Sequence, residues 1–70
     1  MAKVHSYRTG KAEVVKVGDA VGFKSDFEQY GTITKIVGDM LHLHNPSGFG
    51  GDYLRYAQDT VQHAGDCWID

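Results

Sequence analysis

The sequence predicts a small all-β domain, and three observations carry that prediction. First, 70 residues with 41% apolar content are enough for one domain but not for two. Second, no apolar stripe with helical spacing continues over three turns. Third, nine glycines separate segments rich in the β-forming residues Val, Ile, Tyr and Thr. We therefore expect a single small barrel of about five or six short strands, since closure would hide the edges of the sheet.

The first barrel strands are expected on either side of a Gly-Asp bend. Apolar and polar residues alternate over residues 13–17 and again over residues 19–24, which predicts two extended segments. The chain would bend between them at Gly18-Asp19. The polar stretch of residues 25–29 is expected to form a loop that holds one apolar residue, Phe27.

The next two strands are expected to form a hairpin. Residues 30–37 are rich in β-forming residues, but Ile33 and Ile36 are three positions apart, which strict alternation would place on opposite faces. A β-bulge near Lys35 would solve this conflict. Gly38-Asp39 supplies the tight turn. The strand that follows alternates leucine with histidine, which predicts a core-facing and an outward-facing pair, Leu41 and Leu43 against His42 and His44.

The C-terminal third is expected to complete the barrel. Residues 45–51 contain Pro and three glycines and form the longest, exposed loop. Strands are expected over residues 52–57 and residues 60–63. Residues 64–66 then turn the chain, in a form that suits one 3₁₀ turn, and residues 67–70 add the last large apolar groups.

The net charge of −2 conceals an asymmetry. Residues 1–16 carry four cations against Glu13, whereas residues 17–70 carry three cations against eight acids. This pattern predicts a basic N-terminal extension, residues 1–12, in front of a barrel domain formed by residues 13–70. Such a leader can contact nucleic acid or fold back on the acidic body.

Composition also bounds the location and the chemistry. The apolar runs are far shorter than the ~20 residues of a membrane-spanning helix, so no membrane segment is expected. Cys67 is the only cysteine and cannot form an internal disulfide, which favours a reducing cytoplasm. The phosphate-loop, zinc-protease, Cys-x-x-Cys and Gly-x-Ser-x-Gly motifs do not occur.

The stretch from Val17 to Val21, followed by Tyr30 to Ile36, resembles the opening of small SH3-like barrels such as KOW and Tudor-like domains. In those domains a Gly-Asp turn precedes the first barrel strand, and a Gly-x-Ile strand follows one loop later. Residues 38–43 resemble the third strand. The likeness covers residues 15–70 and implies a fold rather than an activity, because such barrels host unrelated functions. The whole chain, including its Cys67 to Asp70 ending, is also similar to small phage-type proteins.

This resemblance implies two kinds of ligand. KOW domains bind RNA or ribosomal proteins, but the corresponding loop of this chain, residues 25–29, has no glycine and carries two acids. Tudor-like domains bind methylated Lys or Arg in an aromatic cage, for which the first and third loops here offer Phe27 and Phe49. Phe23, Tyr30 and Tyr53 flank these positions, and Asp26, Glu28 and Asp52 would add negative potential.

We therefore predict a non-enzymatic module that binds a protein or peptide, with a basic ligand favoured. Aromatic anchors and acidic side chains of the loops form the predicted site, which consists of Phe27, Phe49, Tyr30, Tyr53, Asp26 and Glu28. Two interpretations of the loop phenylalanines stay open, as exposed anchors or as plugs over the barrel mouth. The remaining aromatic residues with the parity or neighbours of core positions are Phe23, Tyr56 and Trp68.

The alternative function is KOW-like binding of nucleic acid by the basic N-terminal segment. The cations that would contact phosphates are Lys3, Arg8, Lys11 and Lys16. Such contact would be weak and would fall steeply with salt. A homodimer is a further open alternative, because small domains with thin cores gain stability by association.

The histidines and the cysteine raise two other hypotheses. His42 and His44 lie on one face of one strand, about 6.6–7 Å apart, and with His63 and Cys67 they match zinc-ligand types. A Cys67–His63 pair could act as a nucleophile and its base. We favour outward-facing histidines and a buried cysteine, and so expect no metal, no cofactor and no catalytic residues.

Overall fold

The computed structural model describes residues 2–70 and has an all-β fold, as predicted. Its seven strands and one 3₁₀ helix are β1 (Ala2–Ser6), β2 (Ala12–Val15), β3 (Ala20–Ser25), β4 (Phe27–Val37), β5 (Met40–His44), β6 (Asp59–His63), η1 (Ala64–Asp66) and β7 (Cys67–Ile69). The number of strands exceeds the expected five or six. Within this part of the chain, no helix has the length and apolar character that crossing a membrane requires.

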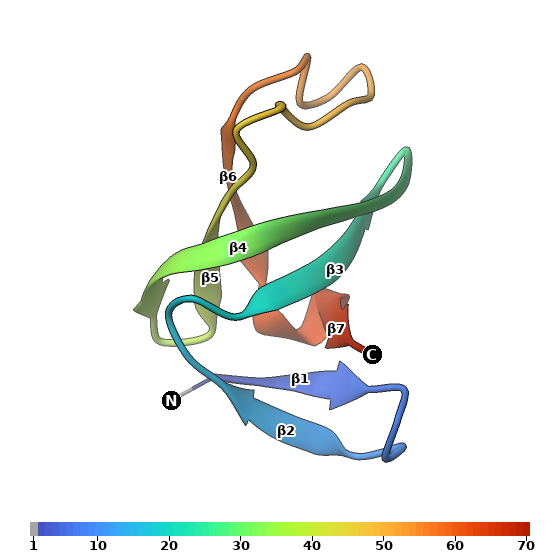
Figure 1. Ribbon diagram of the computed structural model, residues 1–70, viewed down its shortest axis with the longest axis vertical. Coiled ribbons are helices and arrows are strands. Elements are labelled where there is room, and N and C mark those ends of the chain that lie inside the picture. Colours follow the sequence, from blue (N-terminus) through green and yellow to red (C-terminus); the bar gives the residue numbers. More distant parts are fainter. Residues whose placement is uncertain (1) are drawn as a thin grey trace.

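All seven strands belong to one curved sheet with the order β2-β1-β7-β3-β4-β5-β6. Neighbouring strands are antiparallel, except that β1 and β7 run parallel. The long strand β4 crosses the molecule, and the β1–β2 hairpin lies at the opposite end from the loop that joins β5 to β6 (Figure 1). Because β2 and β6 end the strand order, strand pairing does not close this sheet into a complete barrel.

The N-terminal residues are part of this sheet. Residues 1–12 were expected as an extension outside the barrel, but β1 lies between β2 and β7. Small or apolar residues alternate with polar ones along β1, so every second side chain faces inward. Val4 is 1% exposed, whereas Lys3 and His5 point to solvent. The expected boundary at residue 12 therefore falls within a continuous structure.

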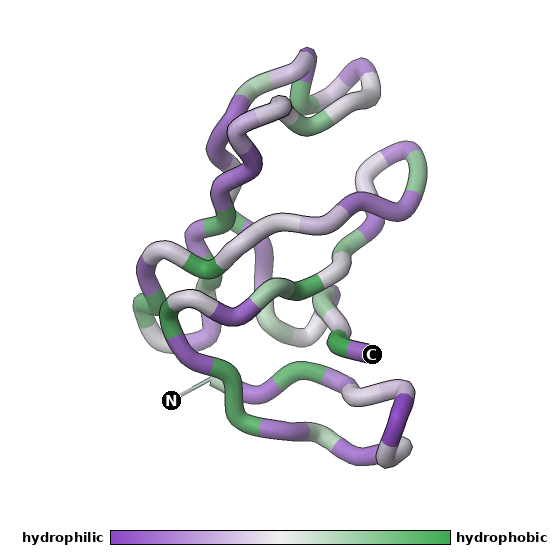
Figure 2. The backbone as a smooth tube through the Cα atoms, in the orientation of Figure 1, coloured by the Kyte–Doolittle hydropathy of each residue, from purple (hydrophilic) through white to green (hydrophobic). Residues whose placement is uncertain are grey.

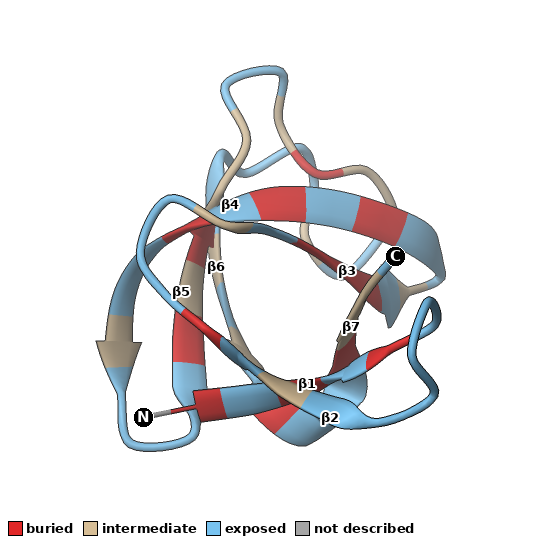
Figure 3. Ribbon diagram, turned by 60° about the horizontal axis from the view of Figure 1, so that its bottom comes forward, coloured by how far each residue is buried: buried red, intermediate tan, exposed pale blue. Residues whose placement is uncertain are grey.

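The core is formed by inward-facing side chains from both halves of the chain. Its buried apolar members are Ala2, Val4, Val15, Val21, Phe23, Ile33, Leu41, Leu43, Phe49, Ala64 and Cys67. Buried and exposed positions alternate along β1 and β4 (Figure 3), and along β1 hydropathy changes with them (Figure 2). The predicted core positions Leu41 and Leu43 are confirmed.

The β4–β5 hairpin contains the predicted irregularity. Its register shifts between Ile33 and Lys35, which confirms the bulge. The extra residue lets Ile33 lie fully in the core while Ile36, three positions on, still packs against it. Gly38 has a φ of +59° in the turn, a conformation that glycine adopts without steric cost.

A long loop, residues 45–58, joins β5 to β6. The strand expected over residues 52–57 was a wrong prediction, because Gly51, Arg55 and Tyr56 all have positive φ values, which end an extended conformation. Tyr56 was expected in the core and is instead 76% exposed.

The C-terminal residues form η1 and β7, which confirms the predicted 3₁₀ turn. Strand β7 lies between β1 and β3 and buries Cys67 at 3% exposure. The indole of Trp68 occupies the space that a Cβ at Gly22 would need. Gly22 is thus required by the close approach of β7 to β3.

Candidate functional site

Most of the predicted binding residues lie where the β3–β4 hairpin meets the loop between β5 and β6 (Figure 1). We call this region the tip and define it as residues 25–29 and 48–56. The expected polar loop over residues 25–29 was wrong, because both strands continue to the end of the hairpin. Ser25 pairs with Phe27, and Asp26 alone makes the turn with a φ of +66°.

Two polar side chains fasten the long loop to the hairpin. The Asp26 carboxylate Oδ2 accepts a hydrogen bond of 2.7 Å from the Asp52 amide. Gln29 holds Gly50 twice, because its Oε1 accepts from the Gly50 amide at 2.7 Å and its Nε2 donates to the Gly50 carbonyl at 3.1 Å. Gln29 is only 7% exposed, so these bonds are largely shielded from water. The tip is therefore an ordered unit rather than a free loop.

The two loop phenylalanines, predicted as a pair, have different environments. Phe49 is 1% exposed and packs edge-to-face on Phe23, with ring centroids 5.3 Å apart. Gly31 leaves room for it, since a Cβ there would lie 3.0 Å from the Phe49 ring. Phe49 is therefore a core plug, and its prediction as an exposed binding anchor is corrected.

Phe27 remains accessible, with 51% of its surface exposed. The Cζ end of its ring points at Gly50, where an added Cβ would come within 2.6 Å of Cζ. The Gly50 backbone thus packs against the end of the ring. An aromatic side chain held in this way loses little further freedom when a partner covers it.

The tyrosines divide between two faces. Tyr53 and Tyr56, at 79% and 76% exposure, are the most exposed large apolar side chains of residues 2–70. Tyr30 points to the outer face of β4, where it lines a hollow of about 210 Å³ with His44 and Pro46. Of the predicted aromatics, the structure thus brings Phe27 and Tyr53 to the tip and directs Tyr30 elsewhere.

The carboxylates near the tip are not equally free. Asp26 is engaged with the Asp52 amide. Glu28 stands opposite Lys24 in the β3–β4 register. Together with Asp52 these acids number three, against the two cations Lys24 and Arg55 in the same region.

The predicted nucleic-acid residues occur on the β1–β2 end. Lys16 forms an ion pair with Asp19, with Nζ 3.3 Å from Oδ1. The pKa of Glu13 is lowered, first by hydrogen bonds from Ser6 and Thr9 and also by the charge of Arg8. Lys3 and Lys11 are exposed. Among the described residues, one of the four predicted cations, Lys16, is therefore already paired with a carboxylate of its own chain.

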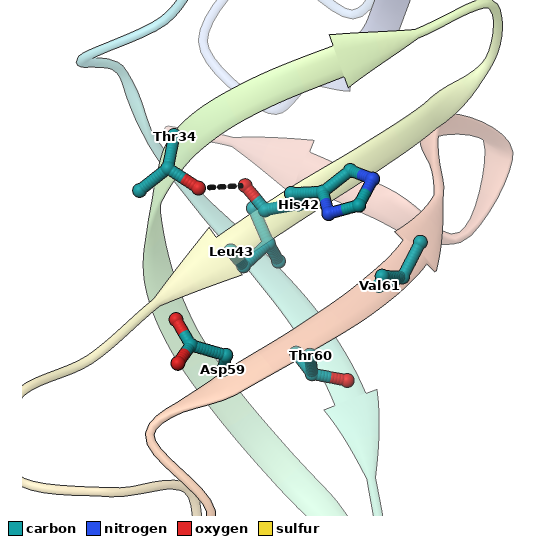
Figure 4. A pocket seen from close by; sticks show the side chains of 6 residues that line it. All are labelled: Thr34, His42, Leu43, Asp59, Thr60 and Val61. Carbon is teal, nitrogen blue, oxygen red and sulfur yellow. Dashed lines mark hydrogen bonds between the residues drawn. The ribbon is translucent and has the colours of Figure 1, made fainter.

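A second hollow, of about 220 Å³, lies on the outer face of β4, β5 and β6. Figure 4 shows its lining, in which the Thr34 hydroxyl donates to the His42 carbonyl at 3.3 Å. His44 lies beside it, with Nδ1 2.8 Å from the Asp59 carboxylate. The prediction that His42 and His44 turn away from the core agrees with their half-buried positions on this face.

The environment of Cys67 does not suit a nucleophile. Its thiol donates to the carbonyl of His63 at 3.4 Å, while the His63 imidazole accepts from the Gly65 amide. Burial, with a further contribution from Asp66, raises the pKa of Cys67 to about 11, so the thiol is protonated at neutral pH. Within residues 2–70 no group of three or more His, Cys, Asp or Glu side chains is arranged to hold a metal ion.

Two tip residues were missed by sequence reasoning. Gln29 shares the strand parity of the buried positions Gly31 and Ile33, and that parity could have identified it as inward-facing. Tyr56 carried no such signal, because its exposure depends on the turn conformation of the loop.

No family model, curated protein or solved structure matches this chain.

Proposed function

We propose that this protein is a non-enzymatic binding module that recognises a protein or peptide through the tip. One observation carries the proposal, namely that Tyr53 and Tyr56, the most exposed large apolar side chains of residues 2–70, lie on a loop fastened beside the half-exposed Phe27. Exposed aromatic side chains on a rigid support are typical of the residues that dominate binding energy.

The backbone conformation of the tip also supports its role as the binding surface. The non-glycine residues with positive φ within residues 2–70 are Asp26, Arg55 and Tyr56, and all belong to the tip. A bulky residue such as Tyr56 rarely adopts this conformation, which costs on the order of 1–3 kcal/mol. Such strain persists where the surrounding structure maintains it, and it concentrates at binding sites.

A basic ligand is favoured by the local charge. The acids Asp26, Glu28 and Asp52 exceed the cations Lys24 and Arg55 by one, and the whole chain carries a net charge of −2. We further propose that the domain is SH3-like. This resemblance rests on Gly18-Asp19 before β3 and on the Gly-x-Ile pattern that begins at Gly31 in β4.

Nucleic-acid binding by the basic N-terminal residues is less well supported. Lys16 is paired with Asp19, and β1 itself is a structural strand. Among the described residues, the ion pair leaves Lys3, Arg8 and Lys11 as the predicted cations that contact no carboxylate.

The test uses arrays of synthetic peptides of basic, neutral and acidic composition, and a mixed-sequence single-stranded RNA as a second probe. We expect binding to basic peptides, and we expect the double variant Phe27→Ala/Tyr53→Ala to weaken it at least about tenfold. Tyr7→Ala is the matched control, because Tyr7 is a 65% exposed aromatic at the β1–β2 end.

Three results would reject the proposal. One is the absence of binding to any peptide, and another is peptide binding that the double variant leaves unchanged. The third is preferential binding to RNA that falls steeply with salt and is lost in Lys3→Ala/Lys11→Ala, which would instead establish the nucleic-acid function.

A further inference from the structure

Strand β6 is an open edge of the sheet. It has five residues, Asp59–His63, and within residues 2–70 only β5 pairs with it. Neither lysine nor proline, the residues that commonly protect an edge, occurs in it. Val61 at its centre is 46% exposed. Such a strand can pair with another strand of suitable sequence.

The hydrogen bonds next to β6 reveal which of its backbone groups are free. The Asn45 amide donates to Gln58 at 2.9 Å, and the Ala64 amide donates to Asp39 at 2.7 Å. In an antiparallel ladder the bonded pairs recur at every second residue, so Thr60 and Gln62 bond to β5. The amides and carbonyls that point away from β5 therefore belong to Asp59, Val61 and His63. Of these groups, the His63 carbonyl already accepts one hydrogen bond from the Cys67 thiol and keeps a second lone pair.

The sequence of this edge is complementary to itself. If a second copy of β6 pairs antiparallel with Val61 opposite Val61, then Asp59 of each copy faces His63 of the other. Thr60 then faces Gln62. In this register, all three outward residues of one copy form hydrogen-bonded pairs with the three outward residues of the other. Any other antiparallel register aligns fewer outward residues with one another.

We propose that β6 is a homodimer interface in which two copies extend one sheet across a twofold axis centred on Val61. Hydrogen-bond complementarity selects the second copy as the occupant, because the arrangement contains two Asp59–His63 pairs, each with an imidazole donor facing a carboxylate acceptor, and no opposed like charges. Side-chain pairs directly across an antiparallel ladder stabilise it, and the apolar Val61–Val61 pair adds to the two hydrogen-bonded pairs.

The hydrogen bonds of His63 and Asp59 within one copy leave a donor and an acceptor for the Asp59–His63 pairs. The His63 Nδ1 accepts a hydrogen bond of 2.9 Å from the Gly65 amide, which directs the proton of the neutral ring to Nε2. The Asp59 Oδ1 lies 2.8 Å from the His44 Nδ1, and Oδ2 makes no hydrogen bond among the described residues. A His63 Nε2 donor and an Asp59 acceptor are thus available on the same outer face.

The other edge, β2, is less suitable. It has four residues, and the Ser6 amide bonds to the Lys11 carbonyl at 2.8 Å, so the alternation leaves outward backbone groups at Ala12 and Val14. Val14 is 49% exposed, much like Val61. Val14 is therefore the matched control position for substitutions of Val61.

The first experiment is sedimentation velocity over a concentration series. We expect the wild-type chain to form dimers that dissociate on dilution. Val61→Lys places two positive charges opposite each other and should raise the dissociation constant at least about tenfold, while Val14→Lys should leave it unchanged. A wild-type chain that stays monomeric, or a dimer that persists in Val61→Lys, would overturn the proposal.

A second measurement tests the register. Residues of a hydrogen-bonded antiparallel pair have Cα atoms about 5.5 Å apart, a spacing that a disulfide bridges. We expect Val61→Cys to form a covalent dimer on oxidation and Thr60→Cys to do so far more slowly, because Thr60 faces Gln62 in this register. Equal or faster cross-linking of Thr60→Cys would disprove the register.

Discussion

The β1–β2 hairpin and the tip are held in place by different means. Strand β1 has neighbours on both sides, β2 antiparallel and β7 parallel, and its inward residues are buried. The loop of the tip lacks strand partners and is held by the side chains of Asp26, Gln29 and Phe49. Backbone ladders distribute stability over many residues, whereas the tip concentrates it in a few.

This difference predicts where single substitutions have large effects. At the β1–β2 end, loss of one side-chain contact leaves the ladder intact. At the tip, loss of one contact loosens a segment that has local turn hydrogen bonds but pairs with no strand among the described residues. The predictions below test this contrast, in order of decreasing expected effect.

Phe49→Ala should have the largest effect. The ring is buried against Phe23 and Gly31, so its removal leaves a cavity and should lower the free energy of unfolding by about 3–5 kcal/mol. Urea denaturation measures the change. Phe27→Ala is the control, and its 51% exposure predicts a loss below about 1.5 kcal/mol. Equal losses for the two variants would contradict the core role of Phe49.

Gln29→Leu should have an intermediate effect. It removes both bonds to Gly50 and leaves the Gly50 amide without its partner, which should cost about 1–3 kcal/mol. Hydrogen exchange of the Gly50 amide should accelerate by more than that of residues in β1. Gln58→Ala provides the control, since its side chain makes one exposed bond to Pro46. An unchanged Gly50 exchange rate would show that Gln29 does not hold the loop.

Asp26→Ala should have a smaller effect, about 1 kcal/mol, because it removes one exposed hydrogen bond to the Asp52 amide. Asp26→Asn keeps an acceptor and tolerates positive φ, so it should be nearly neutral. Thermal denaturation compares the two. If both variants lose the same stability, the carboxylate charge rather than the hydrogen bond is responsible.

Acidification should have the smallest effect, and it should act on the β1–β2 end. Hydrogen bonds from Ser6 and Thr9 hold the pKa of Glu13 below its ordinary value of 4.5. The stabilisation is therefore complete above pH 4.5 and is lost as the pH falls through the lowered pKa of the folded state. Amide exchange in the β1–β2 hairpin should accelerate over that range, and Glu13→Gln should remove this dependence. The neutral Gln29–Gly50 contact contains no group that titrates there.

The sequence predicted only part of the candidate site, because the residues that form it are far apart in the sequence. Phe27 and Tyr53 reach the tip as expected, but the contacts that order it join residues 21 and 26 positions apart, Gln29 with Gly50 and Asp26 with Asp52. No local pattern indicates such pairs. Phe49 was ambiguous for the same reason, because its burial depends on the space beside Gly31.

The sequence by itself determined the features that arise from neighbouring residues. Alternation with a period of two specified the all-β class and the core leucines, the spacing of Ile33 and Ile36 specified the bulge, and Gly38 specified a turn. Only the tertiary structure decided that β1 joins the sheet beside β7, that Phe49 is buried and that β6 remains an open edge. These outcomes depend on which distant segments pack together, and short-range periodicity does not encode that choice.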